Sequence, residues 1–228
     1  MAKGYSQVYG EDYLEVFSPV AMQKSIRTIV AIAASNGMKI HHMDVVTAFL
    51  NSPLPAIGNK EVLQELAPGC EPLGMGSVVK VFRAFYGFKQ SPREWNKTLH
   101  DYFTAQKFTQ SKIDPCVYYK GDELYVAVYV DDLFICGRNV TLITEFKTAM
   151  KSRYKMSDLG LLSWELGMHF SQTDDGIFID QAQYIAGKLK LYGISEWGCA
   201  TPLKKDFQLF LDNDDTPRDT VFPYRSAV

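Results

Sequence analysis

Residues 124–136, LYVAVYVDDLFIC, decide the fold. Two apolar runs, Leu124 to Val130 and Leu133 to Cys136, flank the acidic pair Asp131-Asp132. Short runs rich in valine, tyrosine and phenylalanine on either side of a polar pair are typical of a β-hairpin, although no glycine is present to ease a two-residue turn. We therefore predict two buried strands with two carboxylates at their shared end.

These two carboxylates need a compensating charge, because adjacent acids in an apolar setting repel each other and lose hydration. No lysine or arginine lies close to them in the sequence, so either a bound cation or a distant basic residue across the sheet must compensate. Oxygen ligands without a nearby cysteine or histidine favour Mg²⁺ or Mn²⁺ over zinc. Asp44, at the end of a strand predicted over residues 38–46, is the best third carboxylate, and it is also a candidate helix N-cap.

The sequence contains two further Asp-Asp pairs, and neither has apolar neighbours on both sides. Asp174-Asp175 precedes Gly176 in a polar stretch, where aspartates are ordinary turn residues. Asp214-Asp215 lies in an acidic tail. Of the three pairs, we therefore predict a metal site only at Asp131-Asp132.

The length and composition of the chain limit its size class, its location and its metal chemistry. The chain has 228 residues, of which 46% are hydrophobic, enough for one large domain or two small ones. No uninterrupted apolar run reaches the roughly 18 residues that a membrane span needs, and the N-terminus lacks the apolar core of a secretory signal. Its four cysteines have no CxxC spacing, and His41 and His42 would point to opposite faces of a strand. We expect a soluble intracellular protein with free thiols and no zinc site.

The net charge of −2 hides a segregation of charge along the chain. Basic residues predominate over residues 80–112 and 138–155, whereas acidic residues predominate over residues 206–219. The two basic tracts have two interpretations: they follow a nucleic-acid backbone, or they are solvated faces of helices.

Apolar periodicity predicts an interleaving of helices and strands. Ser91, Pro92 and Glu94 fit a capping box that opens the clearest helix. Further helices are predicted over 22–35, 141–153 and 181–191, and a second hairpin over 164–171 and 177–180. This pattern predicts an α+β fold in which helices cover one face of an antiparallel sheet.

An ordered series of motifs resembles the reverse transcriptase domain of copia-type (pseudovirus) LTR retrotransposons. The series covers nearly the whole chain and reads AKGYSQ, EDYLEVFSPVA, HHMDVVTAFLNSPL, FYGFKQSPREW, YVAVYVDDLFICG, KMSDLG, ELGMHF and YRSAV. The resemblance implies a right-hand polymerase palm with partial fingers over residues 1–200. It also implies that residues 201–228 form an acidic linker or tail, beyond which an RNase H domain normally follows.

The same resemblance implies roles for six residues. Asp44 and Asp131 would bind two Mg²⁺ (or Mn²⁺) ions directly, and Asp132 would support them more peripherally. Phe49 matches the aromatic gate that excludes a 2′-hydroxyl, and Lys89 with Gln90 matches the element that contacts the incoming nucleotide and the template. Without the resemblance, Phe49 would be interpreted as core packing, and the Lys89-Gln90 pair as a loop before a helix.

The implied activity is RNA-directed and DNA-directed DNA synthesis from deoxynucleotides (dNTPs) on a primer paired with an RNA or DNA template. The implied location is a cytoplasmic retrotransposon particle, with the nucleus as an alternative. A second hypothesis is a truncated, inactive palm fragment that at most binds nucleic acid, because the fingers strand that precedes AKG in full-length relatives is not in this sequence. A nucleotide cyclase ranks third, since Tyr129-Val130 stands where cyclases carry glycines before the acids.

Overall fold

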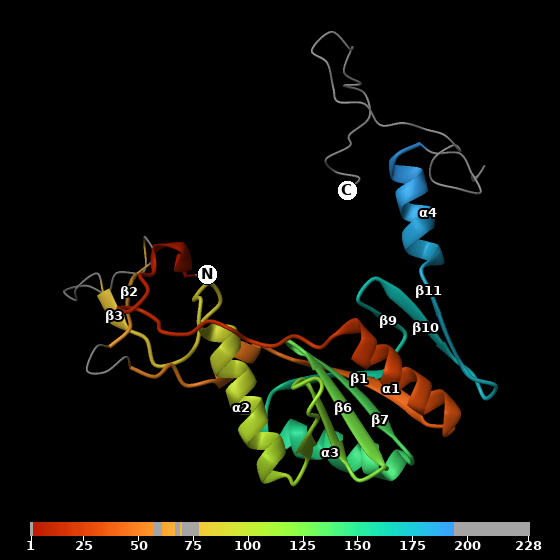
Figure 1. The fold of residues 1–228 in the computed structure, drawn as a ribbon. Helices are drawn as coiled ribbons and strands as arrows, with labels where there is room; N and C mark the ends of the chain where they lie inside the picture. Colours follow the sequence, from red (N-terminus) through yellow and green to blue (C-terminus); the bar gives the residue numbers. More distant parts are fainter. Residues whose placement is uncertain (1, 57–60, 67–68, 70–77, 194–228) are drawn as a thin grey trace. The chain divides into compact units, whose positions relative to one another are not determined.

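The computed structural model describes residues 2–56, 61–66, 69 and 78–193 (Figure 1). The chain divides into two compact units, Met1–Ser163 with Gln172–Ile177, and Trp164–Ser171 with Phe178–Val228. The predicted acidic tail over residues 201–228 and much of the connection between residues 57 and 77 lie outside the described residues.

The first unit is built on a six-stranded antiparallel sheet with the strand order β4-β5-β6-β7-β1-β8. The predicted hairpin forms its centre, with β6 at Leu124–Tyr129 and β7 at Asp132–Gly137. Strand β1 (Lys39–Val45) lies beside β7 and ends one residue after Asp44, as predicted. The remaining strands, which the sequence did not predict, are β4 (Thr109–Gln110), β5 (Val117–Lys120) and β8 (Met156–Leu161).

Helices α2 (Ser91–Ala105) and α3 (Val140–Arg153) cover one face of this sheet. Apolar side chains of both helices pack against alternate residues of β6 and β7, as the two-residue period of a strand requires. Phe103 of α2 lies at the centre of this core, with ring centroids 4.5 Å from Tyr118 and 6.1 Å from Phe146. This packing holds the shape of the central hairpin.

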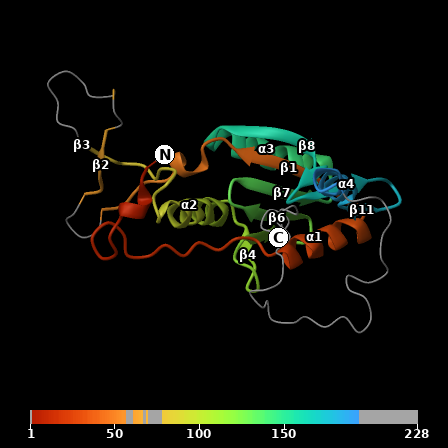
Figure 2. The same cartoon turned by 90° about the horizontal axis from the view of Figure 1, so that it is seen from above.

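Helix α1 (Gln23–Ser35) packs on the opposite face, so the prediction that the helices cover one face only was wrong. Figure 2 shows strands β1, β6 and β7 between α1 and α3. Met38, just beyond α1, contacts Cys136 of β7 through sulfur atoms 3.5 Å apart. Cys136 alternates with Ile135, which belongs to the core under α2 and α3. The central strands are apolar on both faces, and therefore need a helix on each.

The predicted capping box at the start of α2 was also wrong in detail. Ser91 is already the first helical residue, and Gln90 is the N-cap. The Ser91 hydroxyl instead accepts from the Phe85 N–H and donates to the Phe85 carbonyl, at 3.0 and 2.7 Å. Ser91 thus closes the loop before the helix rather than capping the helix.

Short elements complete the described part of the chain. The first unit adds η1 (Gly4–Ser6), η2 (Ala48–Asn51) and a two-stranded sheet of β2 (Leu63–Glu65) and β3 (Val78–Lys80). The predicted second hairpin splits into β9 (Trp164–Glu165), β10 (Met168–Gln172) and β11 (Ile177–Asp180), which are followed by α4 (Ala182–Leu191). None of the described helices has the length and apolar character needed to cross a bilayer.

Candidate active site

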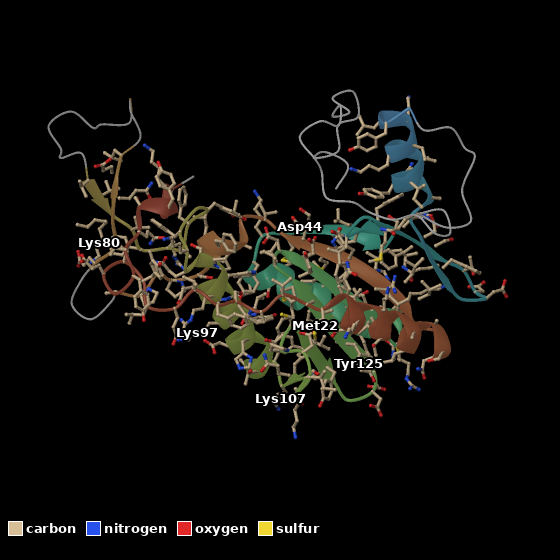
Figure 3. The ribbon with its side chains drawn as sticks, turned by 45° about the horizontal axis from the view of Figure 1, so that its top comes forward. Met22, Asp44, Lys80, Lys97, Lys107 and Tyr125 are labelled. Carbon is tan, nitrogen blue, oxygen red and sulfur yellow. The ribbon has the colours of Figure 1, made fainter. Side chains whose placement is uncertain are left out.

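The antiparallel register brings two of the predicted carboxylates together. Asp44 of β1 lies directly opposite Asp132 of β7, and Asp132 lies opposite Tyr129 of β6. Figure 3 labels Asp44 towards the end of β1. Directly opposed residues in adjacent strands have Cβ atoms about 4.5–5.5 Å apart, so like charges there repel each other. The sheet therefore concentrates negative charge at one position on the face covered by α1.

Asp131 reaches the same place from the turn between β6 and β7. The turn consists of Val130 and Asp131, whereas Asp132 is already part of β7. Val130 has φ 58°, the left-handed region that glycine favours and a β-branched residue rarely adopts. The Trp95 indole N–H donates to the Val130 carbonyl at 2.8 Å, and the Val45 N–H donates to the Asp131 carbonyl at 2.9 Å. Those two bonds hold a strained turn against α2 and β1.

The two carboxylate oxygens of Asp131 have different surroundings. Oδ2 accepts a hydrogen bond from the Tyr86 hydroxyl at 3.3 Å. Oδ1 is buried and has no hydrogen-bond partner among the described residues. Burial raises the pKa of Asp131, and the charges of Asp44 and Asp132 raise it further, against the opposing effect of the Tyr86 hydrogen bond. A buried, partnerless carboxylate oxygen is costly, and is a position where a cation would bind favourably.

Asp132 is paired with a residue that sequence reasoning did not select. Its Oδ1 lies 2.8 Å from Nε2 of His42, whose ring is buried and lies 5.6 Å from that of Phe134. His41 points to the other face, where its Nδ1 lies 2.9 Å from the Lys147 ammonium. The prediction that the two histidines face opposite ways is confirmed, and the alternation along β1 would have indicated His42 once Asp44 was chosen.

No described lysine or arginine forms an ion pair with Asp44, Asp131 or Asp132. The second basic tract supplies no such partner, because Lys147 is buried and bonds Asp158 at 2.6 Å, with Lys151 2.9 Å from the same carboxylate. The alternative of a distant basic residue across the sheet therefore finds no support in the described part. Three carboxylates with one unpartnered buried oxygen suit a hard divalent cation such as Mg²⁺ or Mn²⁺.

Phe49 lies beside this cluster, in η2. Its ring centroid is 4.6 Å from that of Tyr86, the residue that bonds Asp131. Burial raises the pKa of Tyr86, as do the Asp131 charge and hydrogen bond. Tyr86 belongs to the FYGFKQ motif, so the motif pointed to the segment but not to this side chain.

Lys89 and Gln90 make their contacts with the N-terminal segment instead. Lys89 Nζ donates to the Gln7 carbonyl at 3.1 Å and lies 5.0 Å from the centroid of the Tyr13 ring. The buried Gln90 amide accepts from the Gln7 side chain and donates to the Asp12 carbonyl, each at 3.0 Å. Among the predicted site residues, the structure thus brings together the three aspartates and Phe49, but not Lys89 and Gln90.

Comparison with known proteins gives this site a family. A family model described as reverse transcriptase (RNA-dependent DNA polymerase) matches residues 1–205. The chain is similar, at 33% identity over its whole length, to the retrovirus-related Pol polyprotein from transposon TNT 1-94 of Nicotiana tabacum, of which it covers 18%. At 33% identity over 81% of its length it also resembles the retrovirus-related Pol polyprotein from transposon RE1 of Arabidopsis thaliana, of which it covers 13%.

The chain belongs to the reverse transcriptase (RNA-dependent DNA polymerase) family. The transposon relatives further confirm the prediction that it is a reverse transcriptase domain of the copia type of retrotransposon. A putative transposon Ty5-1 protein of Saccharomyces cerevisiae is 28% identical over 82% of the chain, and the chain covers 61% of it. The chain spans less than a fifth of the length of the two plant polyproteins.

Proposed function

We propose that the chain catalyses RNA-directed and DNA-directed DNA synthesis by two-metal nucleotidyl transfer from a dNTP to a primer 3′-hydroxyl. The observation that carries this proposal is the meeting of Asp44, Asp131 and Asp132 at one end of the neighbouring strands β1 and β7, without a lysine or arginine partner among the described residues. Family membership supports the polymerase chemistry in general. The substrates would be dNTPs and a primer paired with an RNA or DNA template.

The geometry supports different roles for the three carboxylates. Asp131, with its partnerless Oδ1, and Asp44, which has no ion pair among the described residues, would hold the two metal ions. Asp132 is already paired with His42, which suits a peripheral, supporting role. When bound, the metal ions would lower the pKa of the primer 3′-hydroxyl and stabilise the charge on the transferring phosphoryl group.

The other predicted residues would act on the substrate. Phe49 would stack under the sugar of the incoming nucleotide and exclude a 2′-hydroxyl, a role that its half-buried place beside Tyr86 supports. Lys89 and Gln90 would contact the nucleotide and the template. Since their side chains bond the N-terminal segment, they would have to exchange those partners on binding.

The test is extension of a DNA primer on an RNA template, with Mg²⁺ or Mn²⁺ and with EDTA as the metal-free control. We expect metal-dependent extension by the 228-residue chain, and its loss, to the level of the EDTA control, in the Asp131→Asn, Asp132→Asn double variant. The matched control is Asp174→Asn with Asp175→Asn, which changes the exposed turn pair by the same chemistry and should extend normally.

Equal extension by wild type and the Asp131, Asp132 variant would refute the assigned site. Absence of extension by a folded wild-type chain would instead favour the inactive palm fragment. Circular dichroism of each variant separates loss of catalysis from loss of folding.

A further inference from the structure

We propose that Tyr86 is a positioning residue of the site, whose hydroxyl selects the oxygen that Asp131 presents to a metal ion and whose ring fixes Phe49. This inference rests on the proposed function. The Tyr86 side chain contacts both Asp131, through its hydroxyl, and Phe49, through its ring.

The hydrogen bond from the Tyr86 hydroxyl gives the two carboxylate oxygens of Asp131 different roles. Tyr86 donates to Oδ2, while Oδ1 is left buried and without a partner in the described chain. A carboxylate free to rotate could offer either oxygen, or both, to a cation. One held at Oδ2 offers Oδ1, in the orientation that the hydrogen bond fixes. Groups that orient metal ligands in this way typically contribute 10–100-fold to metal affinity or activity.

The Tyr86 ring contacts Phe49, the residue proposed to exclude nucleotides that carry a 2′-hydroxyl. The Tyr86 ring centroid is 4.6 Å from that of Phe49, with the planes tilted by 47°. Tyr86 therefore links the turn that bears Asp131 to the short helix η2 that bears Phe49, and both contacts depend on a single side chain.

Tyr86 itself is held from the backbone side by the N-terminal segment. The Ala2 N–H donates to the Tyr86 carbonyl at 2.8 Å. The next residue, Gly87, has φ +107°, and a Cβ there would lie 2.1 Å from the Ala2 carbonyl oxygen. Only glycine permits this close approach, so the conformation of the loop is set before any ligand binds, as a positioning residue requires.

The first experiment measures metal binding directly, by the electron paramagnetic resonance of free Mn²⁺ titrated with the 228-residue chain. Tyr86→Phe keeps the ring and removes the hydroxyl, and we expect Mn²⁺ to bind 10–100-fold more weakly. Tyr125→Phe is the matched control, because Tyr125 lies towards the other end of the same hairpin, opposite Cys136 (Figure 3). It should bind Mn²⁺ as the wild type does.

The second experiment separates the ring from the hydroxyl by comparing incorporation of deoxynucleotides and ribonucleotides. Tyr86→Phe should keep the wild-type preference for deoxynucleotides, because its ring still supports Phe49. Tyr86→Leu should lose at least about tenfold of that preference, a difference near 1.4 kcal/mol, as well as Mn²⁺ affinity. A purely structural role for Tyr86 would not separate the two variants in this way.

The outcomes distinguish this inference from the proposed function. Wild-type affinity for Mn²⁺ in Tyr86→Phe would overturn the positioning role while leaving the aspartate site intact. Unchanged sugar preference in a folded Tyr86→Leu chain would overturn the link to Phe49. A folded wild-type chain that binds no Mn²⁺ would overturn the proposed metal site, and this inference with it.

Discussion

At the scale of single residues, Asp131 lies where its ionised carboxylate is electrostatically disfavoured. Its carboxylate is partly buried, lies near two other acids and follows a residue in the left-handed region. Each of these features costs free energy in the protein without ligand, and strain of this kind is common where function maintains it. The Tyr86 hydroxyl is the single side-chain donor described for this carboxylate. The site is therefore destabilising until a cation binds.

Asp131→Asn should therefore stabilise the metal-free chain. Because the pKa of Asp131 is raised in the folded state, the ionised form is disfavoured on folding, and stability falls as pH rises through the carboxyl range. A neutral amide keeps an oxygen to accept from Tyr86 and removes the like charge. We expect the free energy of unfolding at pH 7 to rise by roughly 0.5–2 kcal/mol.

The measurement is urea denaturation in EDTA at pH 7, with Asp175→Asn, at an exposed turn, as the control for loss of one acid. A decrease in stability of the Asp131 variant would show that its carboxylate has a stabilising partner, contrary to the geometry described above. The gain should shrink at pH 4, where the wild-type carboxyl is itself increasingly protonated.

At the scale of elements, strand β1 carries side chains that make polar contacts on both faces of the sheet. His42 and Asp44 lie on the face of the carboxylates, while His41 lies on the face of α3, where Lys147 bonds both His41 and Asp158 of β8. The pairing of β1 with β8 is irregular between His42 and Met43. Lys147, His41 and Asp158 form a cluster, the Lys147 cluster, which holds β8 against the strand that carries Asp44.

The sequence predicted the central hairpin, β1 and the main helices because their periodicity is local. It could not predict contacts made between distant segments. The N-terminus of α1 has no side-chain cap of its own. Instead, the Met22 N–H donates a hydrogen bond to the carboxylate of the buried Asp114, 92 residues away, at 2.9 Å. Tyr86 was missed for the same reason, since loop closure fixes its partners, whereas His42 had a local signal, because it lies two residues before Asp44 on the same face of β1.

The Lys147 cluster predicts a pH dependence of stability. Burial lowers the pKa of His41, and the Lys147 charge lowers it further, with Asp158 opposing. The unfolded chain, in which His41 has a pKa near 6.5, therefore binds more protons at mildly acidic pH. Stability should fall as pH drops below about 6.5, by at most about 1.4 kcal/mol per pH unit for this one group.

The measurement is the free energy of unfolding between pH 7.5 and 5, followed by urea denaturation. His41→Gln retains an acceptor for Lys147 and should flatten the profile, whereas the control His100→Gln should keep it. An identical slope in wild type and His41→Gln would show that the cluster does not couple His41 to folding.

A separate loss of stability is expected below about pH 4, and it comes from Asp158. Burial raises the pKa of the Asp158 carboxyl, but the hydrogen bonds from Lys147 and Lys151 outweigh burial and hold this pKa well below its usual range.

At the scale of the whole molecule, the proposed ligands lie within one compact unit. Asp44, Asp131 and Asp132 belong to the unit formed by Met1–Ser163 and Gln172–Ile177. The chain corresponds to less than a fifth of the two plant polyproteins it resembles. If the carboxylates alone make the metal site, this unit should bind metal without the rest of a polyprotein, because its ligands are positioned by its own sheet.

Metal binding should therefore stabilise this unit selectively. A ligand at 100 times its dissociation constant adds about 2.7 kcal/mol to the stability of the state that binds it. For a chain of this size the corresponding rise in melting temperature is roughly 5–10 °C. Differential scanning calorimetry with Mn²⁺ should show this shift in the transition of the carboxylate-bearing unit, and the other unit, if it melts separately, should not move. Asp131→Asn should abolish the shift although it raises the metal-free melting temperature, whereas the exposed pair variant Asp174→Asn, Asp175→Asn should retain it. A shift that survives Asp131→Asn would place the metal elsewhere in the chain, and the two-metal assignment would then have no support from stability.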